Sequence, residues 1–456
     1  MSQVTIETNQ WTNETITRLV EPSPDGQSAR WTGTRPLRTI RIGLLGLGNV
    51  CSAVVRAIDR GLPEFEARGV RLEPVTALIR DETKPRGLSS RQFRVTTDVK
   101  AFLAAKPDVI VEALGGIEPA RSLIERALKA GIPVISANKS VLAAHGPALS
   151  RVARENGTDL LFEAAVVAGV PFLTLLRNRP LTRRATRITG ILNGTSNFIL
   201  SRLSRGRESF GESVAEAQRL GFAEPDASAD LSGRDAAEKL VIILQQLGLP
   251  SIGVTELEVR GIESQTPADL ARAKTFGGTI KPVAFAEKRG DHVEAFVGPA
   301  FVRNSSPLAG VHGEQNIVSL SGEGAIPLTL IGPGAGPDVT AATLIDDVAE
   351  CFDGRHATAV ETAPEDAKPN VTAPRTAWFL RCPIADESTP FARVAESLAQ
   401  HEINVRDVAG APAGASRRTV YLLTSEATRE EIEVAIRTLE WTLTGEVLAI
   451  RAIDND

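Results

Sequence analysis

The pattern of apolar and polar positions divides the chain into regions with different predicted structure. Residues 1–38 are polar, rich in Thr, Ser, Pro and Gly, and lack sustained periodicity, so they are predicted to form a flexible leader. From Thr39 onward, short β-branched runs alternate with helical patterns, and strands are expected at 40–45, 75–79, 109–112, 134–136 and 160–163. Alternation of this kind indicates a parallel, doubly wound sheet.

After Arg183 the pattern changes to polar–apolar alternation, as at 187–192, 293–297 and 317–320. Period two is typical of strands with one buried face, so a mixed or antiparallel central sheet covered by helices is predicted. The segment from Val360 to Pro374 contains three prolines and has linker composition. Beyond it, the expected elements follow the order βαββαβ, which indicates a small ferredoxin-like module.

The predicted fold class is therefore α/β combined with α+β, in several domains. A chain of 456 residues exceeds what one core usually supports. The expected segments are the leader at 1–38, a parallel-sheet domain at 39–165 with a return at 330–355, a central-sheet domain at 166–330, a linker at 356–375 and a terminal module at 376–456.

Composition excludes several classes of function. The net charge is −5 and the pI is near 5.8, with no basic run, so nucleic acid is not expected as a partner. The chain has no apolar run of about eighteen residues. Its N-terminus also lacks a charged region followed by an apolar segment, the pattern of a signal peptide. Neither a membrane span nor a signal peptide is indicated, and a cytoplasmic location is expected.

Cysteine and histidine spacing argues against metal and disulfide chemistry. The three cysteines lie far apart, and the five histidines show no H-x-x-H or H-E-x-x-H spacing. Neither a disulfide framework nor a zinc site is predicted.

A glycine-rich turn follows the first predicted strand. Gly46-Leu47-Gly48 leads into a helical pattern, and glycines at this place let the backbone approach a pyrophosphate at a helix N-terminus. This context favours dinucleotide binding by Gly46, Gly48, Asn49 and Val50 over a plain turn. The third motif position is Cys51, whose small thiol is expected to be tolerated there; the alternative is that it pushes the helix outward and weakens cofactor binding.

The end of the second strand bears on the choice of cofactor. Arg80 stands where an acid usually grips the ribose of NAD, and its guanidinium suits the 2′-phosphate of NADP(H). A solvated arginine beyond a strand end is the other interpretation. Asp81 keeps NAD(H) as the alternative cofactor.

The stretch from Leu220 to Lys239 gathers acids and one lysine on a loop that runs into a helix. Asp235 lies four residues before Lys239, so helical spacing places the carboxylate and the ammonium on one face. A proton donor with an electrostatic partner is what carbonyl reduction requires. The competing interpretation is an ordinary ion pair on a helix surface.

Four segments together resemble the homoserine dehydrogenase family: 112–119, 136–140, 190–198 and 221–239. The resemblance runs from about Arg41 to Ala349, and the terminal module is similar to the ACT domain of many members. It implies a Rossmann-type cofactor domain, a central catalytic and dimerisation domain, and a homodimer or homotetramer. The implied reaction is the reversible, NAD(P)H-dependent reduction of L-aspartate 4-semialdehyde to L-homoserine, in threonine, methionine and isoleucine biosynthesis.

The resemblance also implies roles for individual residues. Lys239 would be the acid that protonates the substrate oxygen, Asp235 would position it, and Lys139 would lie between nicotinamide and substrate. Substrate binding is expected from Glu224, Asp230, Asn193 and Thr195. Further cofactor contacts are expected from Gly115, Asn138, Lys139 and Gly332. Main-chain oxygens of Glu163, Val166, Ala168 and Val170 match a turn that holds a monovalent cation, here sodium, although Val167 is larger than the usual residue.

The terminal module leaves two interpretations open. ACT modules commonly bind an amino-acid effector at a turn that contains glycine, whereas Ile384–Phe391 has none, which argues against threonine feedback. The other interpretation is that the module serves subunit contact. A protein of another class, a catalytically weak regulator that senses an amino acid through this module, is disfavoured. The acids and lysines at 139, 224, 230, 235 and 239 would serve no purpose in such a sensor.

Overall fold

The computed structural model describes residues 37–83, 93–249, 252–334, 336–352, 370–384, 390–410, 418–438 and 443–453. The predicted leader, apart from its last two residues, and most of the predicted linker lie outside these ranges, as do residues 385–389 of the module's first turn. The described residues divide into two units, 37–39 with Leu62–Arg71, and Ile40–Gly61 with the described residues from Leu72 onward. The first unit contains the short helix α3 (Pro63–Ala67). Within the same unit, Arg38 N donates a hydrogen bond to Gly69 O at 2.8 Å.

The first sheet has the strand order β3-β2-β1-β4-β5-β6. Its strands are β1 (Arg38–Leu45), β2 (Val70–Leu78), β3 (Arg94–Thr96), β4 (Val109–Glu112), β5 (Val134–Ser136) and β6 (Leu160–Leu161). The pairs β2–β3, β1–β4, β4–β5 and β5–β6 are all parallel, which confirms the predicted parallel sheet. The strand order reverses between β1 and β4, and at such a switch point the carboxyl ends of the strands open a crevice for ligands.

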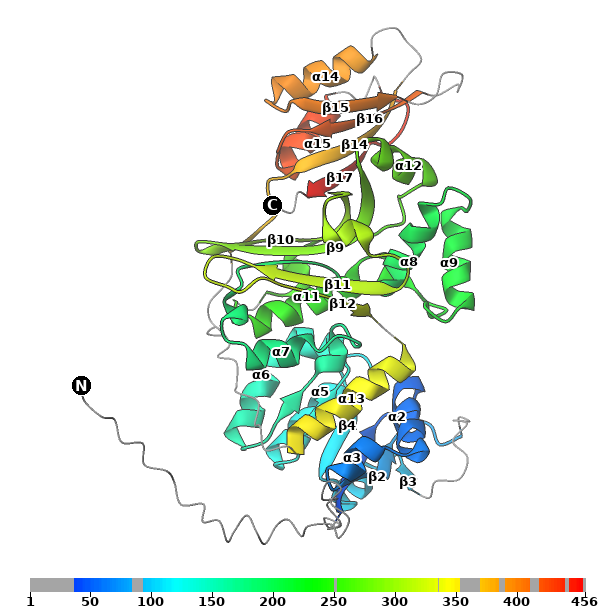
Figure 1. The fold of residues 1–456 in the computed structure, drawn as a ribbon, viewed down its shortest axis with the longest axis vertical. Helices are drawn as coiled ribbons and strands as arrows, with labels where there is room; N and C mark the ends of the chain where they lie inside the picture. The colour runs from blue at the N-terminus through cyan, green and yellow to red at the C-terminus, as the bar shows by residue number, and fades with distance from the viewer. Residues whose placement is uncertain are drawn as a thin grey trace, which may run out of the picture. The chain divides into compact units, whose positions relative to one another are not determined.

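Helices cover this sheet and return to it from the far end of the sequence. They are α2 (Asn49–Arg60), α4 (Val99–Ala104), α5 (Ala120–Lys129), α6 (Lys139–Glu155) and α13 (Pro337–Phe352). α5 packs against α6, and α13 packs against α2 although almost three hundred residues separate them (Figure 1). Cys51 is fully buried on α2, so its thiol is accommodated within the packed core.

The second sheet begins with antiparallel strands in the order β12-β11-β7-β9-β10. They are β7 (Arg187–Ile191), β9 (Gly278–Arg289), β10 (His292–Arg303), β11 (Gln315–Ser321) and β12 (Leu328–Pro333), with β8 (Glu258–Val259) and β13 (Asn370–Thr372) pairing to β10. β13 therefore lies inside the segment predicted as a linker. The predicted antiparallel strands are present, and β9 was not predicted.

One helix of this region, α11 (Arg234–Gln246), packs on the second sheet and carries the run Leu240–Leu244 that is fully buried. Alternate residues of β9 and β10, including Ala284, Ala286 and Val297, share its hydrophobic core. Burying one Leu or Ile side chain stabilises the fold by about 1.5–3 kcal/mol, so this run anchors the helix firmly. The other helices are α7 (Phe172–Asn178), α8 (Gly194–Leu203), α9 (Phe210–Arg219), α10 (Ser228–Leu231) and α12 (Pro267–Thr275), with short 3-10 turns η1 (Glu163–Ala165), η2 (Thr182–Arg184), η3 (Val254–Glu256) and η4 (Pro307–Gly310).

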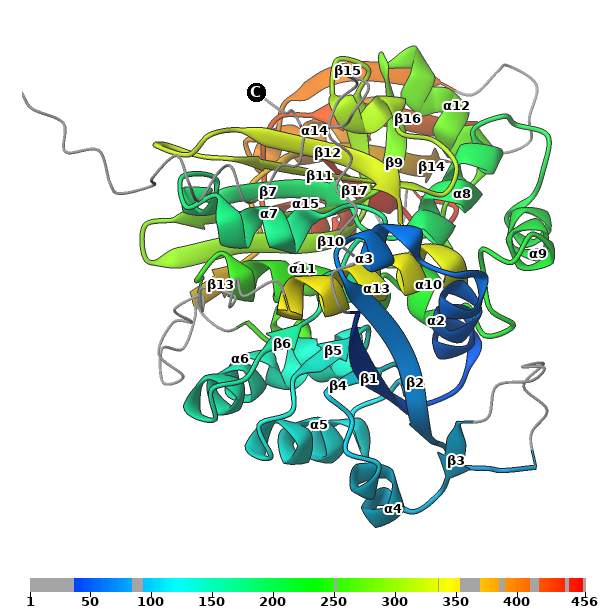
Figure 2. The same ribbon diagram turned by 60° about the horizontal axis from the view of Figure 1, so that its bottom comes forward.

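The terminal region has the predicted βαββαβ order. Its elements are β14 (Ala377–Ile384), α14 (Pro390–Gln400), β15 (Val405–Gly410), β16 (Arg418–Thr424), α15 (Arg429–Arg437) and β17 (Leu448–Ile453). β17 pairs in parallel with β10, with Ala300 opposite Arg451, so the module's strands continue the central sheet into one sheet of eleven strands (Figure 2). None of the helices in the described ranges combines the length and apolar character needed to cross a membrane.

Candidate active site

The predicted glycine turn lies at the carboxyl end of β1. Gly46 has φ +93, and a Cβ added there would approach Ala113 O to 3.0 Å, so only glycine suits this place where the β1 and β4 loops touch. Gly48 is the N-cap of α2, and a Cβ there would meet nothing within 4 Å. Because Gly48 has no side chain, no cap covers the first amides of α2. An uncovered helix N-terminus beside open space fits a pyrophosphate.

The loops after β4 and β5 are joined by a buried carboxylate that the sequence analysis did not single out. Glu112 accepts hydrogen bonds from Ser136 Oγ at 2.6 Å, Leu114 N at 2.8 Å and Asn138 Nδ2 at 3.1 Å. Asn138 Nδ2 also donates to Gly116 O at 2.8 Å. Burial raises the pKa of Glu112 although these bonds favour its ionised form. The signal available in the sequence was polar residues ending two neighbouring parallel strands.

The carboxyl edge of the first sheet thus gathers most of the predicted cofactor residues. Gly46 and Gly48 follow β1, Arg80 is exposed beyond β2, Gly115 follows β4, and Asn138 caps α6 after β5. Gly332 is the exception, because it lies in β12 of the second sheet, where an added Cβ would come within 2.8 Å of Val170 Cγ2.

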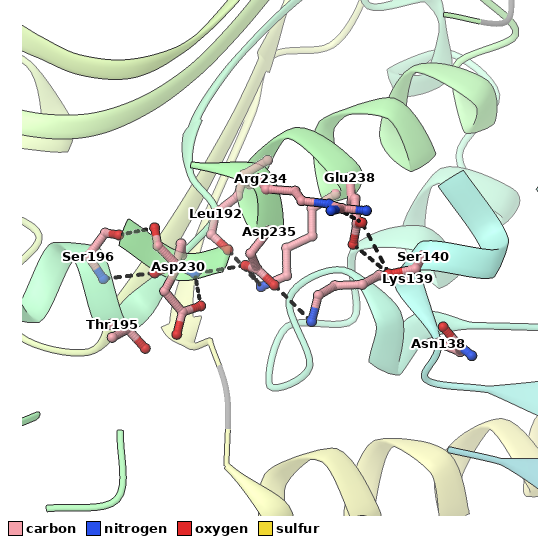
Figure 3. A network of polar contacts seen from close by, with 12 residues as sticks. Asn138, Lys139, Ser140, Leu192, Thr195, Ser196, Asp230, Arg234, Asp235 and Glu238 are labelled. Atoms are coloured by element: carbon pink, nitrogen blue, oxygen red, sulfur yellow. Dashed lines mark hydrogen bonds and ion pairs between the residues drawn. The ribbon is translucent and has the colours of Figure 1, made fainter. Parts of the chain in front are cut away.

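Two lysines from different elements converge on Asp235, near the start of α11. Lys239 Nζ lies 2.8 Å from Asp235 Oδ2, and Lys139 Nζ, from α6, lies 2.9 Å from Asp235 Oδ1. The Lys239 ammonium also donates to Leu192 O at 2.9 Å. Figure 3 shows Asp235 with Lys139 reaching it from the neighbouring helix. The side chains of Lys239 and Asp235 are only 10% and 5% exposed. The competing interpretation of this spacing, an ordinary ion pair on a helix surface, is therefore wrong.

These contacts set the charges in the site. Burial alone would raise the pKa of Asp235, but Lys239 and Lys139 together hold it well below its usual range. The Asp235 carboxylate in turn raises the pKa of Lys139, against the effect of burial. The start of α11 fixes this arrangement, since Gly233 has φ +83 and a Cβ there would lie 3.1 Å from Arg260 O.

Asn193 connects this centre to a second acid. It caps α8 by accepting from Ser196 N at 2.7 Å, and its Nδ2 donates to Asp230 Oδ1 at 2.7 Å and to Asp235 Oδ2 at 2.8 Å. Burial raises the pKa of Asp230, and the charge of Asp235 adds to the effect. Asp230 thus lies beside the two lysines and is held by an amide.

The other two predicted substrate residues have different surroundings. Thr195 is buried at the start of α8, and its hydroxyl donates to Phe222 O at 2.7 Å, which ties α8 to the 220–226 loop. Glu224 is exposed on that loop, and its backbone oxygen accepts from Gln218 Nε2 at 3.3 Å. The structure therefore brings Asp230 and Asn193 to the lysines and leaves the Glu224 side chain at the surface.

The predicted cation turn is compact and buried. Among the predicted oxygens, Glu163 O accepts from Val166 N, Val170 O accepts from Phe172 N, and Ala168 O accepts from the Thr343 hydroxyl. A carbonyl oxygen has two lone pairs, so each keeps one for another partner. Within the part of the chain that the structure describes, no three or more His, Cys, Asp or Glu side chains converge as a metal site.

A doubly wound parallel sheet with an open glycine turn, together with two lysines that meet on the buried Asp235, is typical of an oxidoreductase that uses a nicotinamide dinucleotide. Residues 46–163 match the NAD-binding domain of homoserine dehydrogenase, and residues 171–349 match the homoserine dehydrogenase family. The chain belongs to the homoserine dehydrogenase family. Its activity is the NAD(P)-dependent interconversion of L-homoserine and L-aspartate 4-semialdehyde.

Individual relatives match between 70% and 92% of the chain. The homoserine dehydrogenase of Bacillus subtilis (strain 168) is 32% identical over 82% of this chain and 88% of its own length. The crystal structure of a homoserine dehydrogenase from Thiobacillus denitrificans superimposes with a TM-score of 0.82 at 30% identity, over 92% of this chain and 99% of that one. A hyperthermophilic archaeal homoserine dehydrogenase in complex with NADPH has a TM-score of 0.58 at 25% identity, over 70% of this chain and 100% of that one.

Proposed function

We propose that Lys239 holds the proton that the substrate oxygen gains or loses, and that Asp235 orients it. The supporting observation is the pair of bonds from Lys239 Nζ, to Asp235 Oδ2 and to Leu192 O. An ammonium has three N–H donors, and two of them have acceptors among the described residues. The third is then available for the oxygen on which negative charge develops.

Lys139 supplies a second positive charge next to the first. Its side chain is 38% exposed, more than that of Lys239, so it lies on the open side of Asp235. The nicotinamide, when bound, supplies or accepts the hydride. With both ammonium groups on one carboxylate, Lys139 stabilises the developing oxyanion while Lys239 moves the proton.

Asp230 is assigned to the substrate α-amino group. Its carboxylate is one hydrogen bond from Asn193 and close to the proposed proton donor, and a substrate ammonium would offset the burial that raises the pKa of Asp230. Thr195 acts by holding α8 to the 220–226 loop, and Glu224, on the same loop, would have to turn inward to contact substrate. We expect Asp230→Asn to raise the KM for homoserine by more than the KM for cofactor.

NADP(H) is the proposed cofactor, since Arg80 is exposed at the carboxyl end of β2. One carboxylate oxygen of Asp81, the acid that would bind the ribose of NAD, accepts from both the backbone N and the hydroxyl of Thr83, at 2.8 and 2.6 Å, so this oxygen is already bonded within its own loop. Arg80→Ala is expected to raise the KM for NADP about tenfold and to leave that for NAD nearly unchanged. Equal changes for both cofactors would contradict this assignment.

Sodium is proposed at the turn of residues 163–170, held by the main-chain oxygens of Glu163, Val166, Ala168 and Val170. Carbonyl oxygens suit a hard cation. Replacing sodium by choline at constant ionic strength should lower the melting temperature, and an unchanged melting temperature would contradict the site.

The terminal βαββαβ region is proposed to be an ACT module that serves contact between subunits of a homodimer or homotetramer. The residues of the turn at which an effector is expected, 385–389, lie outside the described ranges. An amino-acid effector there stays the weaker proposal.

The central test compares two lysine variants. Lys239→Ala should lower kcat by about 10²–10⁴-fold, the usual contribution of a positioned proton donor, with NADPH affinity nearly intact. Lys129→Ala is the matched control, because Lys129 also follows an acid by four residues but lies on the surface. Activity would be followed at the nicotinamide absorbance band with homoserine, and cofactor affinity by nucleotide fluorescence. A Lys239→Ala rate close to the parent's would contradict the proposal.

A further inference from the structure

The network around the two lysines contains a carboxylate for which the proposed mechanism has no task. Glu238 precedes Lys239 on α11, and its side chain is 7% exposed. The hydroxyl of Ser140, in the first turn of α6, contacts both carboxylate oxygens, at 3.1 and 3.0 Å (Figure 3). Arg234 Nε approaches the same carboxylate at 3.3 Å from the solvent side. Burying a charged group is unfavourable unless hydrogen bonds compensate for the lost water. The bond from Ser140 therefore helps to stabilise the buried Glu238 carboxylate.

Glu238 and Asp235 are three residues apart on α11 and therefore share one helix face. Their partners, Ser140 and Lys139, are consecutive residues at the start of α6. Helix α6 is thus attached to α11 at two adjacent points, by an ammonium on Asp235 and by a hydroxyl on Glu238. A negative charge beside the N-terminus of α6 also interacts favourably with the helix dipole.

The two attachments differ in what they can fix. A lysine side chain has a flexible four-carbon stem, so its ammonium can reach Asp235 from many placements of the α6 backbone. Ser140 has a short side chain, and its bond to Glu238 restricts the backbone of the first turn directly. The bond at Ser140 therefore restricts the backbone position from which the Lys139 side chain extends to Asp235.

From this geometry we infer that Glu238 and Ser140 form a clasp that positions Lys139 for the reaction. Both are positioning residues that act through Lys139 and contact neither substrate nor cofactor. The inference rests on the role proposed above for Lys139.

The test uses variants that remove the clasp and one that keeps it. Ser140→Ala and Glu238→Ala each lose the bond and should lower kcat on the order of tenfold, since misplacing a reacting group by about 1 Å has effects of this size or larger. The KM for homoserine should stay within about twofold. Glu238→Gln keeps an acceptor oxygen for the Ser140 hydroxyl and should restore a kcat near the parent's. The double variant Ser140→Ala/Glu238→Ala should be no slower than the slower single variant, because both changes break one contact.

Two further measurements separate positioning from loss of folding and from a wrong role for Lys139. Ser122→Ala breaks a similar Ser–Glu bond on the surface, Ser122 Oγ to Glu118 Oε2 at 2.9 Å, and should leave kcat unchanged. Melting temperatures confirm that each variant is assayed folded. If Lys139→Ala is fully active, the role proposed for Lys139 is wrong. If Lys139→Ala is impaired while Ser140→Ala and Glu238→Ala retain the parent's kcat, the clasp alone is refuted. Additive losses in the double variant, or a Glu238→Gln enzyme as slow as Glu238→Ala, would also overturn it.

Discussion

Helices α5 and α11 each carry an acid four residues before a lysine, and the two ion pairs have similar lengths. Glu125 and Lys129 lie 2.6 Å apart with 61% of the lysine side chain exposed, whereas Asp235 and Lys239 lie 2.8 Å apart with 10% exposed. On α11 a second lysine and a backbone carbonyl complete the surroundings. Identical spacing gives a solvated pair in one place and the proposed reaction centre in the other, so burial and tertiary neighbours make the difference.

The two acids also hold their charge for different reasons. A hydrogen bond from Lys129 lowers the pKa of Glu125, which is otherwise in water. Burial opposes ionisation of Asp235, and the pKa of Asp235 is lowered only because two lysines outweigh that effect. Since the folded pKa is the lower one, the stability contributed by Asp235 is present above its unfolded pKa of about 3.9 and is lost as the pH falls through the folded value.

The largest difference between the two helices is expected when each acid is neutralised in turn. Asp235→Asn should lower kcat by about 10²-fold or more, because both lysines lose the carboxylate that orients them. It should also destabilise the fold by about 3–5 kcal/mol, since buried charges are left without a partner. Glu125→Gln should leave kcat unchanged. Steady-state rates and urea unfolding check both, and equal effects of the two variants would show that burial does not matter.

Another buried lysine differs from Lys239, because no carboxylate among the described residues bonds to it. Lys281 on β9 is 2% exposed, donates to Val311 O, and has its pKa lowered by burial to about 8. The unfolded chain then binds more protons between pH 8 and about 10.4, so stability rises with pH across that window. Lys281→Met should stabilise the fold by about 3 kcal/mol near neutral pH, because the buried ammonium that lowers this pKa is removed. Urea unfolding should show this gain shrinking toward pH 10, and a gain independent of pH would contradict it.

Asp347 on α13 is a buried acid, as Lys281 is a buried base, and burial shifts the pKa of both. Other carboxylates lie near Asp347. Asp347 is 2% exposed and accepts from Glu163 N at 3.0 Å. Burial, with the Glu163 charge, raises the pKa of Asp347 well above its ordinary value. A raised folded pKa gives stability that is present below about pH 3.9 and lost as the pH rises through the folded value. Asp347→Asn should therefore stabilise the fold by about 1–3 kcal/mol at neutral pH and not at pH 3, as measured by thermal melts; destabilisation at neutral pH would contradict this.

The smallest effect is expected from the surface pair itself. Glu125→Gln should shift the melting temperature by no more than a few degrees, because an exposed ion pair contributes little and salt screens it. The shift should shrink further in 0.5 M salt, about the ionic strength at which exposed charges hardly interact. A large shift that persists in salt would mean that Glu125 has a structural role beyond the pair.

Local patterns predicted the elements whose neighbours are close in sequence. The strands at 109–112 and 134–136 have their predicted bounds because buried parallel strands appear as short β-branched runs. β9 was missed because Pro282 interrupts its pattern, although it is among the longest strands. The parallel join of β17 to β10 links residues about 150 positions apart, and no local pattern specifies it.

The site was predictable to a similar extent. Helical spacing alone placed Asp235 beside Lys239, and the family resemblance supplied Lys139. The bonds from Asn193 to Asp235 and from Ser140 to Glu238 join residues 42 and 98 positions apart, so they follow only from the packing of α6, α8 and α11. Glu224 shows the opposite outcome, because a residue expected at the substrate lies on the surface of its loop.

The join between β10 and β17 determines how the terminal region can be altered. Deleting residues 377–453 would cut through a continuous sheet and leave the backbone of Ala300, Phe301 and Val302 without its partner strand. The deletion would also remove Arg451, whose ion pair with Glu258 has a length of 2.5 Å and is mostly shielded from water. An uncovered strand edge is a template for aggregation. A shortened enzyme would therefore need charged or proline substitutions along β10 to remain unaggregated. Exchanging this region with that of a relative would require the new last strand to pair with β10 in the same register as β17.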